Sequence, residues 1–444
     1  MWRRSMAWFS SVNQTFIERV QKSKARKDKA ALWLRYYFGQ QSPDLLALIS
    51  AKWSKPEQFR LFEINIVRKI CDKRAMVYLQ KPRRTFGGFD QARGEALYRA
   101  MRADLVLKKA NRLTKLHKTT ALQVGWSEVG PTLAVVTPNI LDVLADDPWF
   151  PTEIIVTRPG ERADQTTYSH WTADSFTRRD SRGAPLPLAD NPGAVNPYGV
   201  LPFVPCFDRD PDDAFFLPGG EDLIEAQQAV NVALVNLWRA IELQSHGQAW
   251  ATGVPVSEAL AVGPDRAVTL PDGGSFGFAS PGTPIEEVLL AVEFLIKQTA
   301  VAHDLATNVF ELSPKAESGA AKVTENRDLL EARQDDLELW RSYEGRLFEV
   351  LKRVVNIHRP GTIPEGATLS VDFGEITEDL SERERLDGYQ RRLDLGVWSP
   401  VDVLLADNPD LCSRDQAIVE LQRRQEEMAL FAPALPGLGF QMGA

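Results

Sequence analysis

The stretch EDLIEAQQAVNVALVNLWRAIELQSH, residues 221–246, decides how the rest of this chain is interpreted. Intervals of three and four between its apolar residues predict one long helix with a single apolar seam. At the rise of an α-helix, this length corresponds to roughly 39 Å. The pattern stops at His246-Gly247. The residues of the seam are Leu223, Ala226, Val230, Leu234, Leu237 and Ile241.

A small insert with strand and turn signals follows, over residues 247–282. Gln248–Thr252 predicts a strand, and a short helix is expected near Ser257–Ala261. Asp272-Gly273 lies between apolar residues and predicts a hairpin-like turn over Leu270–Phe276.

A second helix begins after the insert with a capping pattern. Thr283 can cap it, Pro284 suits the first helical position, and Glu286 completes a T-x-x-E box. We expect this helix to end near Ala306. Two amphipathic helices that flank a small insert cannot bury both of their faces within one slim subunit. The pattern therefore favours packing of each seam against identical copies in a ring.

A polar loop and a very long helix come next. The loop is predicted over Thr307–Gly319 and the helix over Ala320–His358. At roughly 58 Å, this helix exceeds the usual length of globular helices. Its first half is acidic, and its second half becomes apolar and basic.

The C-terminal part is predicted to hold one strand and three further helices. Thr368–Phe373 is the strand candidate. Helices are expected over about Asp379–Leu395, from Ser399-Pro400, and from Ser413. The tail over residues 432–444 is rich in proline and glycine, and we expect it to fray.

The first 120 residues are predicted to be mainly helical, and they are strongly basic. They contain 27 Lys and Arg against 9 Asp and Glu, a balance of +18 in a chain whose net charge is −8. Such polarity is typical of a molecule with two faces or two partners, and also of a solvated basic helical face beside an acidic body. Residues 81–88 combine basic side chains with Pro82 and Gly87-Gly88, which predicts a basic turn or loop.

Residues 119–206 change character. Short runs rich in β-branched and aromatic residues alternate with Gly, Pro and Asp clusters, which is typical of a β-rich unit. The proline-dense stretch from Pro185 to Pro211 predicts an extended connector, because proline lacks a backbone donor and excludes helix. We therefore expect an α+β fold that is mainly helical.

Composition narrows the class of protein further. The chain has 444 residues, about three domains' worth, and is 44% hydrophobic, which argues against wholesale disorder. No apolar run approaches the ~18 residues of a membrane span, and no apolar region follows Arg3-Arg4 as in a secretory signal. Cys71, Cys206 and Cys412 form no C-x-x-C pair and fit a reducing interior such as the cytoplasm.

A search for catalytic chemistry is mostly negative. The histidines show no metal-binding spacing, and the sequence has no nucleophile elbow and no phosphate loop. We expect no catalytic residue, no cofactor and no bound metal. One alternative stays open: the acidic run 325–338, with Asp335, Asp336 and Glu338, could hold a divalent ion in a metal-dependent nuclease. Otherwise such a charge run is a solvated helix face.

The order of these parts resembles that of the portal, or head–tail connector, proteins of tailed bacteriophages and related gene-transfer particles. The resemblance covers residues 30–430. Its most specific local matches are Asn196–Pro205, Asp222–Ser245 leading into Gly247–Gly253, and Glu317–Ala321.

The resemblance implies a portal fold with a wing, a stem, a clip and a crown, whose subunits assemble into a ring, usually of twelve. Carried over to this chain, the wing is residues 1–220, with a helical N-terminal part and a β-rich part, together with the long wing helix and its strand at 320–375. The two stem helices are 221–246 and 283–306, and they flank the clip at 247–282. The tunnel loop is 307–319, the crown with its C-terminal helices is 376–432, and a flexible tail is 433–444.

The resemblance also implies two sets of site residues. An acidic channel with isolated lysines lets DNA slide, because tight neutralisation of phosphates would give strong binding. An ordinary polar loop beside an acidic helix explains each single residue of that set equally well. The residues implied for the DNA channel and tunnel loop are Glu311, Lys315, Glu317, Lys322, Glu325 and Asp328. Those implied for the clip, which docks motor and adaptor, are Trp250, Val254, Asp265, Arg266, Asp272 and Phe276.

The implied function is that of a ring at one capsid vertex, the channel for packaging and ejection of double-stranded DNA. The implied partners are the terminase large subunit, the head–tail adaptor, the major capsid protein and a scaffold, with no membrane. The ring would assemble in the host cytoplasm and remain in the virion. A scaffold built on helical hairpins, without DNA, is the remaining alternative.

Overall fold

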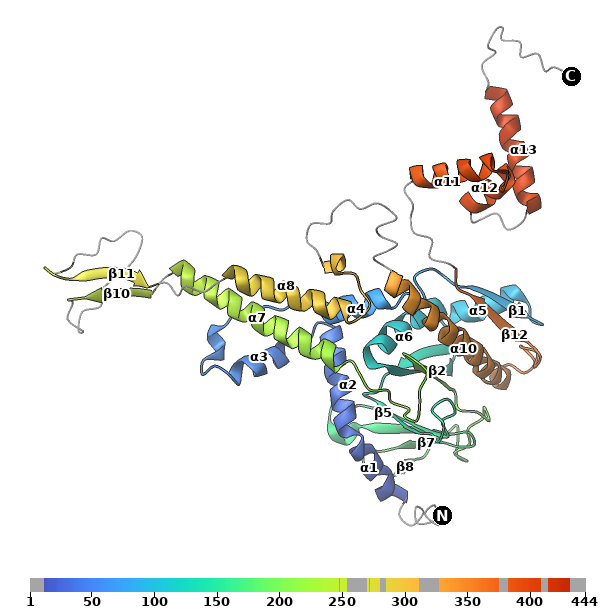
Figure 1. The fold of residues 1–444 in the computed structure, drawn as a ribbon. Helices are drawn as coiled ribbons and strands as arrows, with labels where there is room; N and C mark the ends of the chain where they lie inside the picture. Colours follow the sequence, from blue (N-terminus) through green and yellow to red (C-terminus); the bar gives the residue numbers. More distant parts are fainter. Residues whose placement is uncertain are drawn as a thin grey trace, which may run out of the picture. The chain divides into compact units, whose positions relative to one another are not determined.

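The fold is α+β, with four small antiparallel sheets among the described residues (Figure 1). The chain divides into two compact units, the first made of residues 1–316 and 324–375 and the second of residues 317–323 and 376–444. The structure is a computed structural model, and it describes residues 12–246, 248–253, 270, 272–279, 285–310, 327–374, 382–408 and 414–431.

A three-stranded sheet with the order β3-β2-β9 lies at the centre of the first unit. Helices α6 and α10 contact this sheet. Leu122 and Val204 of the sheet join the same core as Leu107 of α6 and Trp340 of α10. The elements are α6 (Ala103–His117), α10 (Arg327–His358), β2 (Thr119–Ser127), β3 (Gly130–Val136) and β9 (Phe203–Phe207).

The opposite face of this sheet packs against a five-stranded antiparallel sheet. Ala121 and Phe203 share a core there with Ile154 and Trp171. All residues of β9 are buried, because apolar layers cover both of its faces. The second sheet contains β4 (Leu141–Leu144), β5 (Glu153–Arg158), β6 (Thr167–Thr172), β7 (Phe176–Arg179) and β8 (Pro185–Leu186), in that order.

We predicted that the proline-dense stretch 185–211 is an extended connector throughout, but part of it forms strand β9. The N–H of Val124 in β2 donates to the carbonyl of Pro202 at 2.9 Å, which sets the register. Because backbone groups alternate in direction along an antiparallel strand, Pro205 directs its missing donor away from β2. A proline is tolerated there because β9 is an edge strand.

A second strand forms where a basic turn or loop was predicted. β1 (Arg83–Gly87) pairs antiparallel with β12 (Thr368–Asp372). Arg84 and Phe86 are buried while their neighbours along the strand are exposed. The partner strand lies far along the chain, so the residues of 81–88 alone cannot reveal the pairing.

Helices α2 (Lys24–Tyr37), α3 (Ser42–Ser50) and α4 (Ile66–Arg74) pack around the base of the long helix α7 (Glu221–His246). Trp33 and Ile70 share a core with Leu116, Leu223 and Val230. The other N-terminal helices lie elsewhere: α1 (Val12–Lys22) packs on the five-stranded sheet, and α5 (Gln91–Ala100) packs on β1 and α6.

Part of the basic excess in the first 120 residues is paired inside the fold. Arg26 and Lys27 both contact Asp142. Arg84 pairs with Glu344 at 2.6 Å, and both side chains are buried. Neither interpretation of the charge polarity anticipated this internal pairing.

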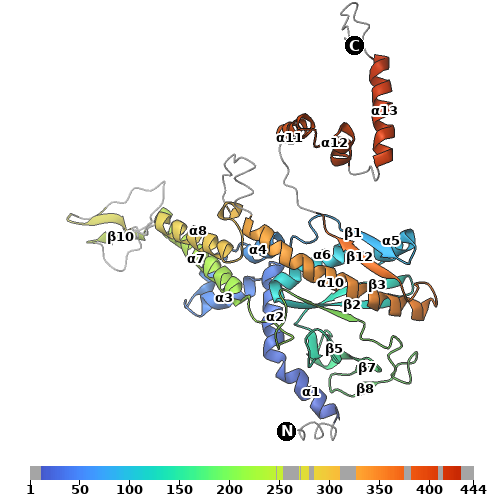
Figure 2. The ribbon, with the colours of Figure 1, turned by 45° about the vertical axis from the view of Figure 1, so that its right-hand side comes forward.

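Helices α7 (Glu221–His246) and α8 (Ile285–Val301) lie side by side as a hairpin (Figure 1, Figure 2). The predicted bounds of α7 are confirmed. α8 is shorter than predicted, because it ends at Val301 rather than near Ala306. Asp304 adopts a left-handed φ of 60°, which an L-residue cannot continue as a helix. The proposed cap at residues 283–284 lies outside the described residues.

A two-stranded ribbon belongs to the insert between the two helices. β10 (Gln248–Thr252) has the predicted bounds and pairs antiparallel with β11 (Ser275–Ala279). Asp272-Gly273 forms a turn as predicted, but β11 continues from it to pair with β10 rather than with Leu270. The predicted short helix at 257–261 lies outside the described residues.

The second unit contains the predicted C-terminal helices α11 (Glu382–Asp394), α12 (Pro400–Asp407) and α13 (Arg414–Phe431). Ser399 and Asp402 form a reciprocal capping box at the start of α12. Residue 413 and the tail 432–444 lie outside the described residues. In the ranges that the structure describes, no helix has both the length and the apolar character required to span a membrane.

Candidate functional site

Buried amide side chains fix the base of α7 to α4. The carboxamide oxygen of Gln227 accepts the N–H of Ile66 at 2.7 Å. Its nitrogen donates to the carbonyl of Ile64 at 2.8 Å and to Asn231 at 2.9 Å. Because buried polar groups require partners, these bonds set the rotation of α7 and decide which face of the hairpin remains outside.

The apolar seam predicted along α7 is largely buried within the chain. Leu223, Val230 and Leu237 are buried, and Val235 packs on Leu45 of α3. The expectation that this seam requires a neighbouring copy is therefore wrong for α7.

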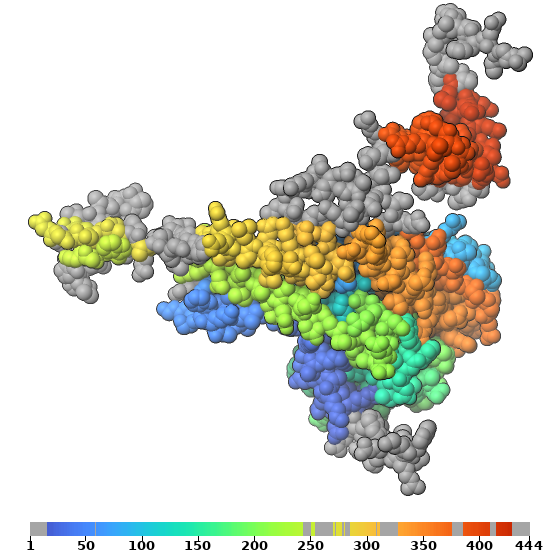
Figure 3. All heavy atoms as spheres, in the orientation of Figure 1, coloured from blue at the N-terminus to red at the C-terminus, as the bar shows by residue number. Residues whose placement is uncertain are grey.

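The exposed apolar side chains lie on α8 instead. Leu290 and Phe294 are each 65% exposed, and Val301 is 53% exposed. Intervals of four and seven residues place them along one face of the helix. We call these three residues the α8 stripe. The atoms of α8 form a continuous ridge beside α7 in the space-filling view (Figure 3).

A second exposed apolar surface flanks α7 on its other side. Leu46, Trp53 and Phe62 are each more than two fifths exposed, and we call them the α3 patch. The ring of Phe62 stacks on Trp238 of α7 at 6.3 Å. α7 lies between α8 and α3 in both ribbon views (Figure 1, Figure 2). Our sequence interpretation missed this patch, although Trp53 and Phe62 stand out as aromatic residues in a polar stretch.

The ribbon β10–β11 carries three of the residues implied for motor and adaptor docking. Trp250 is 45% exposed and lies opposite Gly277. A Cβ atom at residue 277 would come within 2.9 Å of the Trp250 indole, so the glycine lets the ring lie across the ribbon. Asp272 is exposed in the turn, and Phe276 is half-buried. The other three, Val254, Asp265 and Arg266, lie outside the described residues.

One of the implied channel residues falls within the described chain. Asp328 is exposed in the first turn of α10. The preceding short helix η3 (Thr307–Phe310) is tethered to α4, because the Lys69 ammonium donates to the carbonyl of Val309 at 2.6 Å. The implied residues Glu311, Lys315, Glu317, Lys322 and Glu325 lie outside the described residues.

Side-chain contacts also hold the residues that follow α8. Arg74 of α4 pairs with Asp304 at 3.0 Å, and the Nε2 atom of His303 lies 3.3 Å from Asp222 of α7. Burial and the adjacent Arg74 lower the pKa of His303. The segment that leads into residue 311 therefore starts from a fixed position on α4 and α7.

The acidic run on α10 is divided between the interior and the surface. Asp336 is buried and accepts a hydrogen bond from Lys115 at 2.8 Å, whereas Asp335 and Glu338 are exposed. Lys115 also pairs with Asp208 at 2.8 Å. Burial would raise the pKa of Asp208, but Lys115 and a second lysine outweigh it and lower that pKa to about 2. Among the described residues, no three His, Cys, Asp or Glu side chains gather to hold a metal ion, so the nuclease alternative is not supported.

Comparisons with known proteins give likenesses of structure only. No protein-family model matches the sequence, and no curated protein matches it. A chain from the neck of a native GTA particle, computed with C12 symmetry, is 14% identical with a TM-score of 0.45, over 77% of this chain and 88% of that one. A chain from the virion of a native gene transfer agent particle is 14% identical with a TM-score of 0.44, over 81% and 91%. One from the neck of an empty GTA particle, computed with C6 symmetry, is 14% identical with a TM-score of 0.45, over 75% and 86%.

Proposed function

We propose that this chain is a portal protein, copies of which form a closed ring at one vertex of a phage-like capsid. The ring conducts double-stranded DNA during packaging and ejection. Its role is structural rather than enzymatic and requires no cofactor. The order of parts along the sequence and the geometry of the α7–α8 hairpin support this proposal.

The observation that carries the proposal is the presence of two different exposed apolar surfaces on opposite sides of α7. Exposed apolar patches mark interaction surfaces. Two unlike patches on opposite sides fit a head-to-tail interface, which generates a ring when the rotation between subunits closes. In this proposal the α8 stripe of one copy packs on the α3 patch of the next.

The remaining partners follow from the parts implied by the sequence. The β10–β11 ribbon docks the terminase large subunit and then the head–tail adaptor. The segment after Phe310 faces the DNA, and the β-rich body of the first unit meets the major capsid protein and, during assembly, a scaffold. The chain assembles in the host cytoplasm and remains in the virion.

Native mass spectrometry of the full-length protein tests ring formation. Twelve copies of a 49.6 kDa chain weigh about 595 kDa, and electron-microscopy averages viewed down the axis should show a central pore. A monomer or dimer at all concentrations would contradict the proposal.

A single charge in the α8 stripe tests the interface itself. We expect Phe294→Glu to leave the far-ultraviolet circular dichroism unchanged and to abolish the ring, because a buried unpaired carboxylate is costly. Gln165→Glu is the control, since it places the same charge at an exposed polar position between β5 and β6, away from the α7–α8 hairpin. Rings that persist in Phe294→Glu would exclude the α8 stripe from the interface.

A further inference from the structure

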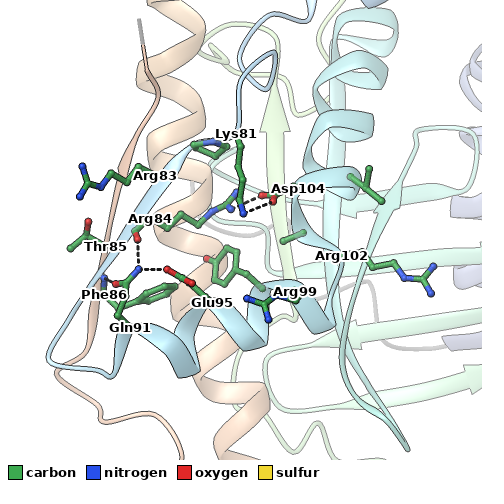
Figure 4. A pocket seen from close by; sticks show the side chains of 14 residues that line it. Lys81, Arg83, Arg84, Thr85, Phe86, Gln91, Glu95, Arg99, Arg102 and Asp104 are labelled. Atoms are coloured by element: carbon green, nitrogen blue, oxygen red, sulfur yellow. Dashed lines mark hydrogen bonds and ion pairs between the residues drawn. The ribbon is translucent and has the colours of Figure 1, made fainter. Parts of the chain in front are cut away.

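A cavity of about 820 Å³ lies between β1, α5 and the start of α6, and the proposed function makes no use of it (Figure 4). β1 and the residues just before it form one wall. α5 and the first turn of α6 form the others. A volume of this order is typical of cavities that hold a ligand.

One edge of β1 faces this cavity. β1 and β12 form a two-stranded sheet, so within the described ranges no strand lies along the other edge of β1. The Gln91 side-chain amide covers that edge: it donates to the carbonyl of Arg84 at 2.8 Å and accepts the N–H of Phe86 at 3.2 Å. One residue of a parallel neighbouring strand would bond these same two groups through its own N–H and C=O.

The cavity wall carries an excess of positive charge. Five cationic side chains and two carboxylates, Glu95 and Asp104, line it. Arg84 is occupied by Glu344 beneath it and by Asp104. Lys81 also lies near Asp104, at 3.9 Å. Arg83 and Arg102 point outward at the rim, on opposite sides (Figure 4). The cationic side chains are those of Lys81, Arg83, Arg84, Arg99 and Arg102.

Tyr98, in the wall of the cavity, carries a buried hydroxyl group without a partner. Tyr98 is 4% exposed, and its hydroxyl makes no hydrogen bond within the described part of the chain. Burial, with the charge of Glu344 nearby, raises the pKa of Tyr98 well above its usual value, so the hydroxyl keeps its proton as a donor. A buried donor without an acceptor is costly, which points to a ligand that supplies the acceptor.

We propose that this cavity binds an extended acidic peptide segment of another protein along the free edge of β1. The peptide main chain takes the two hydrogen bonds that Gln91 makes in its absence, as in strand addition to an exposed sheet edge. Its carboxylates pair with the arginines at the rim, and one of them accepts the Tyr98 hydroxyl. The exposed Leu105 offers an apolar contact to an alternate side chain.

The shape of the charge distribution favours a peptide over other anions. A compact anion in the centre cannot reach both Arg83 and Arg102, because these side chains point in opposite directions (Figure 4). An extended chain that crosses the cavity can contact both. Glu95 and Asp104 can accept hydrogen bonds from the N–H groups of a peptide main chain, and the phosphodiester backbone of a nucleic acid has no such donors.

Fluorescence anisotropy on the full-length protein tests the proposal, with a short labelled peptide in which glutamate alternates with valine. We expect saturable binding that Tyr98→Phe weakens by about tenfold, since this change removes only the hydroxyl. Arg99→Glu should weaken it by at least about tenfold. Gln91→Ala should tighten it by a few-fold, because the variant no longer occupies the edge. Arg162→Glu, on an exposed arginine outside the cavity, is the matched control and should bind as the wild type does.

Several results would overturn this inference. Binding of a lysine–valine peptide with equal affinity would exclude recognition of acidic groups. Displacement of the glutamate peptide by pyrophosphate or by duplex DNA at equal charge concentration would assign the cavity to phosphate anions instead. Full affinity in Tyr98→Phe would show that only non-specific attraction by surface arginines holds the peptide. None of these outcomes depends on whether the protein forms a ring.

Discussion

Glu344 is fully buried in the core of the first unit and accepts three hydrogen bonds. Arg84 provides two of them, at 2.6 and 3.0 Å, and the hydroxyl of Tyr78 provides the third at 2.8 Å. Burial would lower the pKa of Arg84, but its bonds to Glu344 and Asp104 outweigh it and raise that pKa. Arg84 therefore stays charged, and its stability in the interior depends on its carboxylate partners.

We predict that Glu344→Ala destabilises the protein by about 3–5 kcal/mol, because it leaves the buried Arg84 without its main counter-ion. Urea unfolding followed by circular dichroism measures the loss. Glu338→Ala is the control on the same helix: Glu338 pairs with Arg341 at the surface, where such a pair contributes about 1 kcal/mol at most. Equal losses in the two variants would contradict this account of Glu344.

His117 should make the stability depend on pH. It is buried, its ring stacks on Trp33 at 6.0 Å, and neither ring nitrogen has a hydrogen-bond partner among the described residues. Burial lowers its pKa from 6.5 to about 3. Between these values the unfolded chain binds a proton that the folded chain does not, so stability falls as the pH decreases below about 6.5.

We predict that His117→Phe keeps the stacking and removes this dependence. The wild type should lose about 2 kcal/mol between pH 6.5 and pH 5 through this residue, and the variant should lose that much less. Urea unfolding at the two pH values measures the difference. Parallel curves for both proteins would show that His117 titrates normally in the fold.

At the residue scale, the sequence contains little that reveals these partners. Arg84 and Glu344 are 260 positions apart, and nothing in the residues around either predicts their pairing. The implied clip and channel residues came from the resemblance, and several of them lie outside the described residues. The α3 patch and the Gln91 amide on β1 become visible only when the chain is folded.

At the scale of elements, sequence patterns predicted those helices and strands whose bounds depend on interactions between neighbouring residues. The bounds of α7 and β10 and the start of α12 were predicted correctly, because helical periodicity, strand composition and capping depend on neighbouring residues. β1 and β9 were missed, because each exists through pairing with a distant strand. The end of α8 was misplaced because no proline or glycine marks the turn at Asp304.

At the scale of the whole molecule, the order of parts was readable from the sequence, but the surfaces used for assembly were not. The apolar seam of α7 suggested contacts between copies, yet the fold covers that seam from within. The surfaces left for a neighbour are the α8 stripe and the α3 patch. Only the rotation of α7, set by Gln227, determines which residues these are.

Mixing two variants distinguishes a head-to-tail ring from a symmetric dimer. Phe294→Glu damages the α8 stripe, and Trp53→Glu damages the α3 patch. We predict that each variant alone stays monomeric. An equimolar mixture should form pairs of about 99 kDa, because one intact stripe meets one intact patch and the second interface carries two like charges. Native mass spectrometry measures the species.

A symmetric interface would behave differently in the same mixture. Each patch would then meet its own copy, and mixing would produce no species of mixed composition. Wild-type protein mixed with Gln165→Glu serves as the control and should give full rings that contain both chains.

The orientation of Pro205 has a consequence for crowded assemblies. An unpaired strand margin can seed fibrils when many identical molecules stand shoulder to shoulder. Pro205 withholds the one amide hydrogen that an incoming backbone would need at the middle of β9. Tyr343 of α10 bonds both outward backbone groups of Phe207 at this margin, and all residues of β9 are buried, so recognition between crowded copies is left to side chains elsewhere.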